Sequence, residues 1–150
     1  MPDELPVSPV SFYFEDVAFD LPAAAALAQW VISIATVEQR KIIEVNFIFC
    51  SDEHLRVINL EYLDHDYYTD VITFPYTEGA VHGDVFISAD RVRDNAVVLR
   101  ISFEAELCRV MAHGVLHLAG YDDKTPEKKL EMTAREDFFL RSCPDFFAAG

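Results

Sequence analysis

The stretch HGVLHLAGYDD, His113–Asp123, places two histidines four residues apart within a helical pattern. Residues at this spacing share one face of an α-helix and are separated by about 6 Å along its axis. The imidazoles of His113 and His117 can therefore both reach one metal ion, at roughly 2.1 Å each. The segment predicts a helix that presents a pair of metal ligands.

A glycine follows His117 at the point where a third ligand would require the chain to reverse. Gly120 can adopt the left-handed conformation that commonly ends a helix. We predict that Asp123, or alternatively Asp122, then returns to the two histidines, in the layout of the extended zinc-helix motifs. Three protein ligands leave a fourth position for water, which is typical of a catalytic metal site.

Histidines at this spacing also occur as packing or surface residues without a metal. They are not needed for packing here, because the helix has a separate apolar face formed by Leu107, Met111, Gly114 and Leu118. Gly114 also follows His113 at the position where zinc peptidases of the HExxH type carry their general-base glutamate. Peptide hydrolysis is therefore disfavoured.

The elements around this helix indicate one α+β domain over residues 1–150, with a mixed sheet of about four strands, about five helices and a zincin-like metal helix. Strands are predicted at Val10–Asp16, as an edge strand, and at Ile42–Cys50, Asp70–Tyr76 and His82–Ser88. Helices are predicted at Pro22–Ile34, Asp52–Tyr62 and Ala89–Leu99, from Ser102 to Gly120, and from Thr125 to just before Pro144. The predicted N-caps are Ser51, Ser88, Ser102 and Thr125.

Composition restricts the class of protein. The chain has 150 residues, of which 51% are hydrophobic, so it can bury a core without disulfide bonds or other cross-links. Its three cysteines are too few and too scattered for a disulfide framework, and they suit a reducing cytoplasm. The first residues carry neither a basic region nor a long apolar run, so we expect a cytoplasmic protein without a signal peptide or membrane span.

The charge balance conflicts with nucleic-acid binding. Twelve Lys and Arg residues face 26 Asp and Glu residues, giving a formal net charge of −14. Phosphate contacts require Lys and Arg, so an RNA-binding function needs the basic residues to converge on one groove.

Three segments in order resemble the YbeY family of bacterial metal-dependent endoribonucleases, which mature ribosomal RNA. NLEYLDHDYYTDVITFP (Asn59–Pro75) resembles the family's helix–loop–strand segment, HGDVFIS (His82–Ser88) its next strand, and His113–Asp123 its metal helix. The resemblance covers about 70 residues, and the N-terminal part is similar only in the order of its elements. It implies that His113 and His117 are metal ligands.

The sequence departs from the family pattern at two positions. Asp123 stands where most members have a third histidine; aspartate is a competent zinc ligand but adds a negative charge. Leu63 stands where the family usually has an arginine held to be important for activity. A guanidinium would suit a phosphate or the charge that develops in phosphoryl transfer, and leucine can do neither.

Other cations are candidates for the missing role. Arg109 lies one helical turn before His113, so we expect it to be a catalytic residue beside the ligands. The alternative is that Arg109 forms a surface ion pair with Glu106 or Glu104. Arg91, Arg93 and Lys124 are the expected substrate-binding residues.

The resemblance implies a zinc-dependent endoribonuclease that is specific for single-stranded RNA, matures the 3′ end of 16S ribosomal RNA and serves ribosome quality control. Its partners would be RNA or the ribosome. Two imidazoles and a carboxylate suit one Zn²⁺ first, with nickel, cobalt or iron as alternatives. Two other functions stay open: a ribosome-assembly factor that binds RNA or ribosomal protein and uses its metal for structure, and a metallohydrolase of another substrate.

Overall fold

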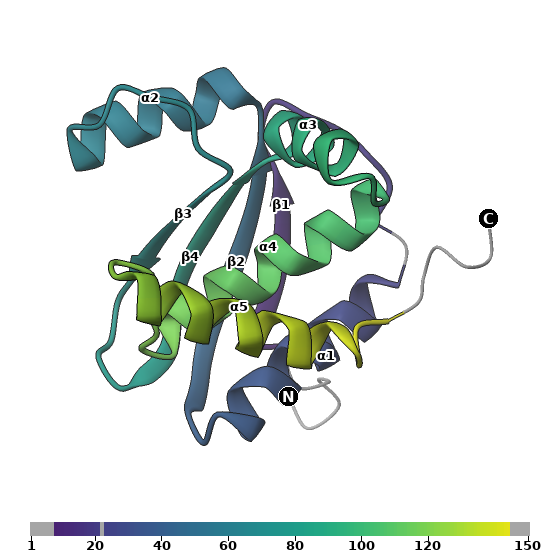
Figure 1. Ribbon diagram of the computed structural model, residues 1–150, viewed down its shortest axis with the longest axis vertical. Helices are drawn as coiled ribbons and strands as arrows, with labels where there is room; N and C mark the ends of the chain where they lie inside the picture. Colours follow the sequence, from purple (N-terminus) through teal and green to yellow (C-terminus); the bar gives the residue numbers. More distant parts are fainter. Residues whose placement is uncertain (1–7, 22, 145–150) are drawn as a thin grey trace, which may run out of the picture.

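The sheet of this protein is mixed, with three parallel strands and one antiparallel edge strand. The computed structural model describes residues 8–21 and 23–144, which form four strands and five helices. The strands are β1 (Val10–Phe14), β2 (Lys41–Cys50), β3 (Val71–Pro75) and β4 (Ala80–Ser88). Their order is β1-β2-β4-β3, and only β3 runs antiparallel to its neighbour (Figure 1). This confirms the predicted α+β class and the edge position of the first strand.

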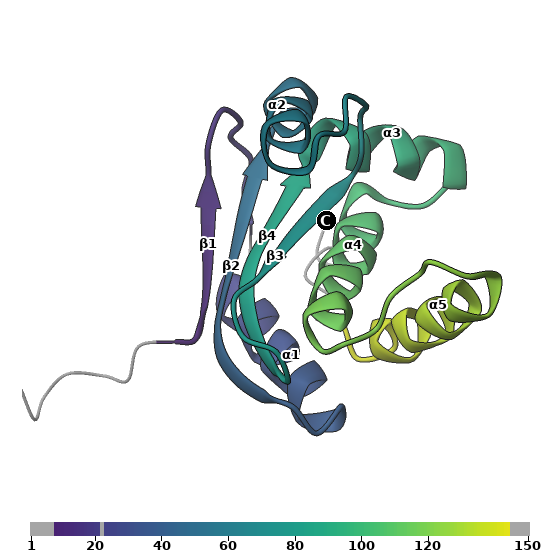
Figure 2. The same ribbon diagram turned by 90° about the vertical axis from the view of Figure 1, so that its left-hand side faces the viewer.

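Three of the helices build two further layers on one face of the sheet. α1 (Ala24–Val37) and α4 (Phe103–Leu118) pack on that face, and α5 (Pro126–Leu140) lies outside α4 (Figure 2). α3 (Ala89–Leu99) packs against α4, whereas α2 (Asp52–Leu63) contributes to a smaller cluster with side chains of the opposite sheet face. α4 is therefore enclosed between the sheet and α5.

The predicted N-caps are confirmed at four helices. The hydroxyls of Ser51, Ser88, Ser102 and Thr125 each accept a hydrogen bond from the backbone N–H three residues later, at 3.0–3.1 Å. Such a bond satisfies one of the N–H groups that the first helical turn leaves without a partner. The short polar residues at these points thus set where each helix begins.

The first helix differs from its prediction at its end. It continues to Val37, three residues beyond the expected Ile34, and its two polar residues near that end have hydrogen-bond partners inside the helix. The Ser33 hydroxyl donates to the Trp30 carbonyl at 2.6 Å, and the Thr36 hydroxyl to the Ile32 carbonyl at 3.0 Å. The expected first-turn proline, Pro22, lies outside the described residues.

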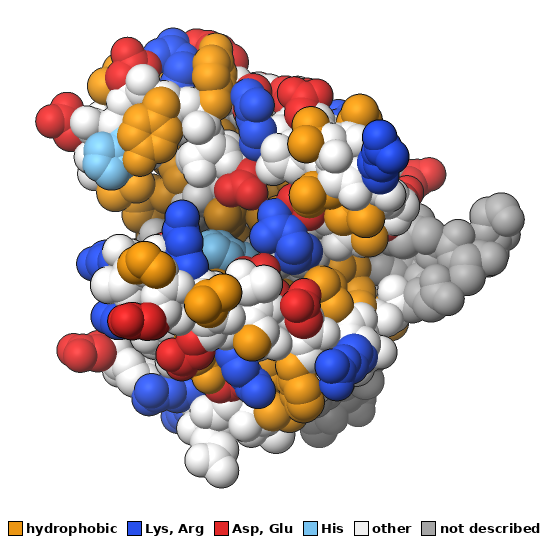
Figure 3. Space-filling model, viewed as in Figure 1, with side chains coloured by type: hydrophobic (Ala, Val, Ile, Leu, Met, Phe, Trp, Pro, Cys, Tyr) orange, Lys and Arg blue, Asp and Glu red, His pale blue; other side chains and the backbone are white. Residues whose placement is uncertain are grey.

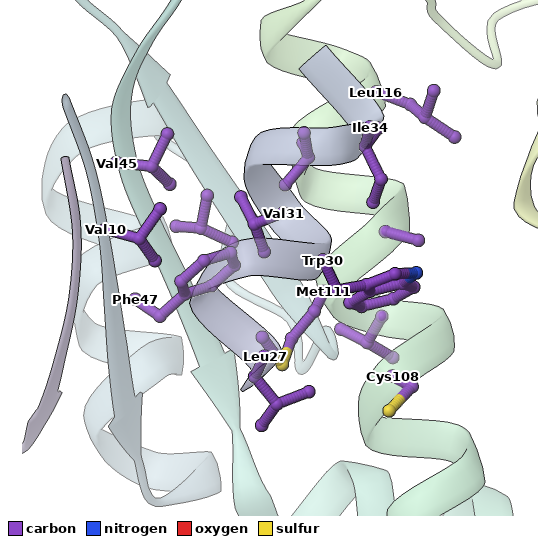
Figure 4. Packing of buried hydrophobic residues seen from close by; sticks show 14 of the residues in the cluster. Val10, Leu27, Trp30, Val31, Ile34, Val45, Phe47, Cys108, Met111 and Leu116 are labelled. Atoms are coloured by element: carbon purple, nitrogen blue, oxygen red, sulfur yellow. The ribbon is translucent and has the colours of Figure 1, made fainter. Parts of the chain in front are cut away.

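The main core fills the space between the sheet, α1 and α4. Figure 4 shows Leu27 and Val31 of α1 near Phe47 of β2 and near Met111 of α4. These side chains are fully buried, as are Val85 and Ile87 of β4. Burial of this apolar area, at roughly 25 cal/mol per Å², is the main force that holds α4 on the sheet.

A glycine allows α4 to approach β4 closely. A Cβ atom added to Gly114 would lie 2.6 Å from a methyl group of Val85, which is fully buried. This position therefore faces the sheet and not the histidines. A glutamate could not serve a metal site from here, which gives a structural reason for the absence of an HExxH motif.

We predict that Gly114→Ala lowers the free energy of unfolding by about 1–2 kcal/mol, because the clash outweighs the better helix propensity of alanine. Urea unfolding of the variant, of Val85→Ala and of the double variant measures this. Truncating Val85 should cost less when residue 114 is alanine. Additive costs would show that the two residues are not in tight contact.

Candidate metal centre

Three ligand atoms converge at the C-terminal end of α4. Nε2 of His117 lies 3.0 Å from Nε2 of His113. The Asp123 carboxylate oxygens lie 3.7 Å from Nε2 of His113 and 3.8 Å from Nε2 of His117. All three atoms lie within 4.8 Å of one another. Tetrahedral zinc with bonds of about 2.1 Å requires ligand atoms about 3.4 Å apart, so this donor set fits a zinc ion.

The turn after α4 brings the aspartate to the histidines. Gly120 has a φ of +111°, and its N–H donates to the His117 carbonyl at 3.1 Å. The N–H of Tyr121 donates to the Leu116 carbonyl at 3.0 Å, which completes the left-handed helix end expected of this glycine. Asp122 is directed elsewhere: its carboxylate accepts from the Lys128 ammonium at 3.1 Å. Of the two candidate aspartates, only Asp123 joins the cluster.

The environment of His117 favours the protonation state that a metal requires. Burial, together with the neighbouring His113, lowers the pKa of His117 below its ordinary value. His117 is therefore neutral at pH 7 and offers a lone pair to an ion. Nδ1 of His113 lies 2.6 Å from Oε2 of Glu136, so the nitrogen of His113 that faces away from the cluster has a carboxylate partner.

An arginine and two buried glutamates adjoin the ligands. Glu106 is fully buried, and Glu136 is 4% exposed. Arg109 donates to both oxygens of Glu106, at 2.7 and 2.5 Å, and to Glu136 at 3.3 Å. The ion pair with Glu106 is thus present, but it is not the surface pair of the sequence-based alternative, because Glu106 is fully buried. Two of the five guanidinium N–H groups of Arg109 are not used by Glu106 or Glu136.

Sequence reasoning missed both glutamates as parts of the site. Glu106 entered the sequence analysis only as an ion-pair partner of Arg109, and Glu136 was not singled out at all. A signal for Glu136 existed: it lies on the buried stripe of α5 between Met132 and Phe139, where a charged residue needs a partner.

Asp70 lies on the other side of Arg109. Its carboxylate is 3.8 Å from the guanidinium, and its carbonyl accepts from the Ser88 N–H at 2.9 Å, which ties the start of β3 to the end of β4. Burial raises the pKa of Asp70, although the charges of Arg109 and His113 oppose this. Asp70 thus combines a backbone contact at the β3–β4 junction with a place beside the candidate metal centre.

The three predicted substrate-binding residues, Arg91, Arg93 and Lys124, differ in their partners and in their position relative to the candidate metal ligands. Arg91 pairs with Asp52 at 2.6 Å and lies over the Tyr68 ring. Arg93 lies over the ring of Phe103, the first residue of α4 and about 15 Å along the helix axis from His113. Lys124 directly follows Asp123 and makes no ion pair among the residues that the structure describes. The structure therefore places Lys124 beside the ligands and Arg93 away from them.

One face of the molecule is hollowed around the histidines. Figure 3 shows a histidine at the bottom of this hollow, with Lys or Arg side chains on either side and apolar side chains above. Leu63, at the family's arginine position, ends α2 and is exposed. None of the described helices has the length and apolar character needed to cross a membrane.

Comparison with known proteins identifies the family. The family model described as "Endoribonuclease YbeY" matches residues 11–143. This chain belongs to the YbeY endoribonuclease family. The YbeY endoribonuclease of Cytophaga hutchinsonii is 49% identical over 133 residues, covering 87% of this chain and 93% of its own. That of Flavobacterium johnsoniae is 44% identical over 129 residues, covering 85% and 92%.

The fold agrees with that of a solved structure. TM1509 from Thermotoga maritima superimposes with a TM-score of 0.62 at 27% identity, covering 89% of this chain and 88% of that protein. The resemblance noted in the sequence is thereby confirmed, and YbeY proteins are metal-dependent hydrolases. The His113, His117 and Asp123 cluster is the candidate metal site of this YbeY protein.

We predict that Arg109→Met lowers the free energy of unfolding by about 3–5 kcal/mol, because it leaves Glu106 buried without a partner. Adding Glu106→Gln should recover part of the loss, since the glutamine carries no charge. Urea unfolding measures both. Arg56→Met, which removes an exposed ion pair with Glu53, is the matched control and should change stability little. Equal costs at Arg56 and Arg109 would contradict the prediction.

Proposed function

We propose that this YbeY protein is a zinc-dependent endoribonuclease that cuts single-stranded RNA in the cytoplasm, and that it matures the 3′ end of 16S ribosomal RNA and serves ribosome quality control. The observation that carries the proposal is the convergence of two imidazoles and one carboxylate at the end of α4. Three protein ligands leave room for a substrate oxygen or a water. Family membership adds that the relatives at 44–49% identity are endoribonucleases.

The residues of the candidate site have different proposed roles. His113, His117 and Asp123 would hold the ion, whose chemistry is to polarise a phosphoryl oxygen and to lower the pKa of bound water. Arg109 is the proposed catalytic cation, because two of its N–H groups are not used by Glu106 and Glu136 and can contact a phosphate. This would supply the positive charge that Leu63 cannot.

The proposed RNA path runs past the ligands from Lys124 toward α3. Lys124 adjoins Asp123, and Arg91 lies beyond Asp70, which itself adjoins Arg109. Arg93 could contact only a longer strand, since it lies near the N-terminal end of α4. Because Arg91, Arg93 and Arg109 have acidic partners, we expect RNA binding to be weak and sensitive to salt.

We predict that His117→Ala abolishes cleavage of a single-stranded RNA, by at least about 100-fold, because the ion loses one of its three ligands. The measurements are metal content by mass spectrometry and gel-based cleavage of the RNA, alone and annealed to its complement. His82→Ala is the matched control, since His82 lies on β4 with a Thr77 partner and outside the cluster. Removal of metal with a chelator should reproduce the loss, and added Zn²⁺ should restore activity.

Equal residual cleavage by the wild type and His117→Ala would contradict the nuclease proposal. It would favour the alternative of an assembly factor that binds RNA or ribosomal protein and uses its metal for structure. Two observations support that alternative. The family arginine is absent at Leu63. Three of the four candidate cations, Arg91, Arg93 and Arg109, already have acidic partners. Cleavage of a different substrate class by the metal-loaded protein would instead favour an unrelated metallohydrolase.

We also predict that Lys124→Gln reduces the salt dependence of RNA binding, because one phosphate contact is lost. The slope of log K against log salt concentration should fall by about 0.7 for a single strand. Fluorescence anisotropy with a labelled oligonucleotide measures this slope. Arg141→Gln is the control: Arg141 follows α5, about 22 Å from Lys124 along that helix, and its loss should leave the slope unchanged. The same change in both variants would place the RNA elsewhere.

A further inference from the structure

We infer that Glu136 is a positioning residue for the metal centre, which sets the tautomer and the orientation of His113 from the neighbouring helix. The inference rests on the proposed metal site. Nδ1 of His113 and Oε2 of Glu136 are 2.6 Å apart, and Glu136 is almost completely buried. An ionised carboxylate only accepts hydrogen bonds, so His113 must donate from Nδ1. Its lone pair then lies on Nε2, which is the atom that faces His117 and Asp123.

The tautomer matters because a metal binds only the unprotonated nitrogen. An imidazole without a partner divides its population between two neutral tautomers, and rotation of its ring costs little. A carboxylate on Nδ1 removes both freedoms and raises the basicity of Nε2. His117 receives no such carboxylate among the described contacts, so Glu136 acts on His113 alone. The partner of His117 outside the cluster is the backbone of Tyr121. The two ligands are therefore unequal, because only His113 has a carboxylate partner outside the cluster.

The position of Glu136 is itself fixed by Arg109. The guanidinium donates to Oε1 of Glu136, while the other carboxylate oxygen faces His113. Arg109 is held in turn by two hydrogen bonds from its Nε and Nη2 to Glu106. Glu106, Arg109 and His113 all come from α4, whereas Glu136 comes from α5, so this network sets the position of α5 relative to the metal ligands.

The charges of the network favour a cation. Two buried carboxylates, Glu106 and Glu136, share a single guanidinium, and Asp70 adds a further acid 3.8 Å from it. The excess negative charge is costly in a buried environment. A dication held by His113, His117 and Asp123 would offset this charge, because Glu136 contacts the same imidazole through Nδ1. Metal binding should therefore stabilise the fold partly through Glu136.

We expect Glu136→Leu to weaken metal binding about 10–100-fold, the range found when such a partner of a ligating histidine is removed. Glu136→Gln keeps an acceptor for Nδ1 but loses the charge, so its affinity should be intermediate. Competition with a chromophoric chelator measures Zn²⁺ affinity. Asp137→Asn, on the exposed side of the same helix, is the matched control and should bind Zn²⁺ as the wild type does.

Nitrogen NMR of the metal-free proteins tests the tautomer without reference to activity. We expect the His113 signals of the wild type to show a protonated Nδ1 and a bare Nε2. Glu136→Gln should retain this pattern, and Glu136→Leu should give a mixture. The rise in melting temperature on adding Zn²⁺ should also be smaller in both variants than in Asp137→Asn. If Glu136→Leu does not fold, the Glu136→Gln protein still reports the affinity and the melting increment.

Wild-type affinity in both variants, or a mixed tautomer in the wild type, would overturn the inference. That result differs from failure of the proposed function. A protein that binds Zn²⁺ through His113 but leaves RNA intact would refute the nuclease and leave the role of Glu136 standing. A wild type that takes up no divalent ion would refute the metal site itself, and the inference with it.

Discussion

The packing of α4 between the sheet and α5 is the constraint on which this structure depends. Two faces of α4 make separate contacts, one with the sheet and the other with α5. Its apolar face lies on β4, so closely at Gly114 that a single added methyl group would overlap Val85. Its opposite face carries Arg109, His113 and His117, which are only partly buried. Because the first contact fixes the rotation of α4 about its axis, it also fixes the direction in which the histidines point.

The acidic residues of this chain lie inside the candidate site as well as on the surface. Glu106, Glu136 and Asp70 surround Arg109, so the guanidinium is shared among acids before any substrate approaches. Such a neighbourhood favours a metal cation and disfavours a polyanion. A nuclease built in this way depends on its ion to overcome the repulsion between its own carboxylates and RNA. The charge conflict noted in the sequence therefore has a local counterpart around the ligands.

The departures from the family pattern lie on different structural elements. Asp123 sits on the turn after α4, where its carboxylate reaches both histidines, so the exchange of histidine for aspartate keeps a ligand in place. Leu63 ends α2 and is exposed, so the loss of arginine there removes a charge without disturbing the core. The first exchange keeps a candidate metal ligand at its position, and the second leaves no charged side chain at position 63.

Local sequence determined the elements and most of the ligand set. The caps at Ser51, Ser88, Ser102 and Thr125, the end of α4 at Gly120 and the pairing of two histidines all follow from interactions within about four residues of each other. The choice of Asp123 over Asp122 did not follow, because both lie within reach of the turn. In the structure the Asp122 carboxylate instead accepts from the Lys124 N–H at 3.0 Å and from the Lys128 ammonium on α5 at 3.1 Å. Glu136 was beyond prediction as a partner of His113, since 23 residues separate the two and the distance is closed by helix packing. Short-range hydrogen bonds and spacing thus determined the helix with its ligands, whereas the electrostatic network behind them was decided by the docking of α5, which depends on burial across the whole domain.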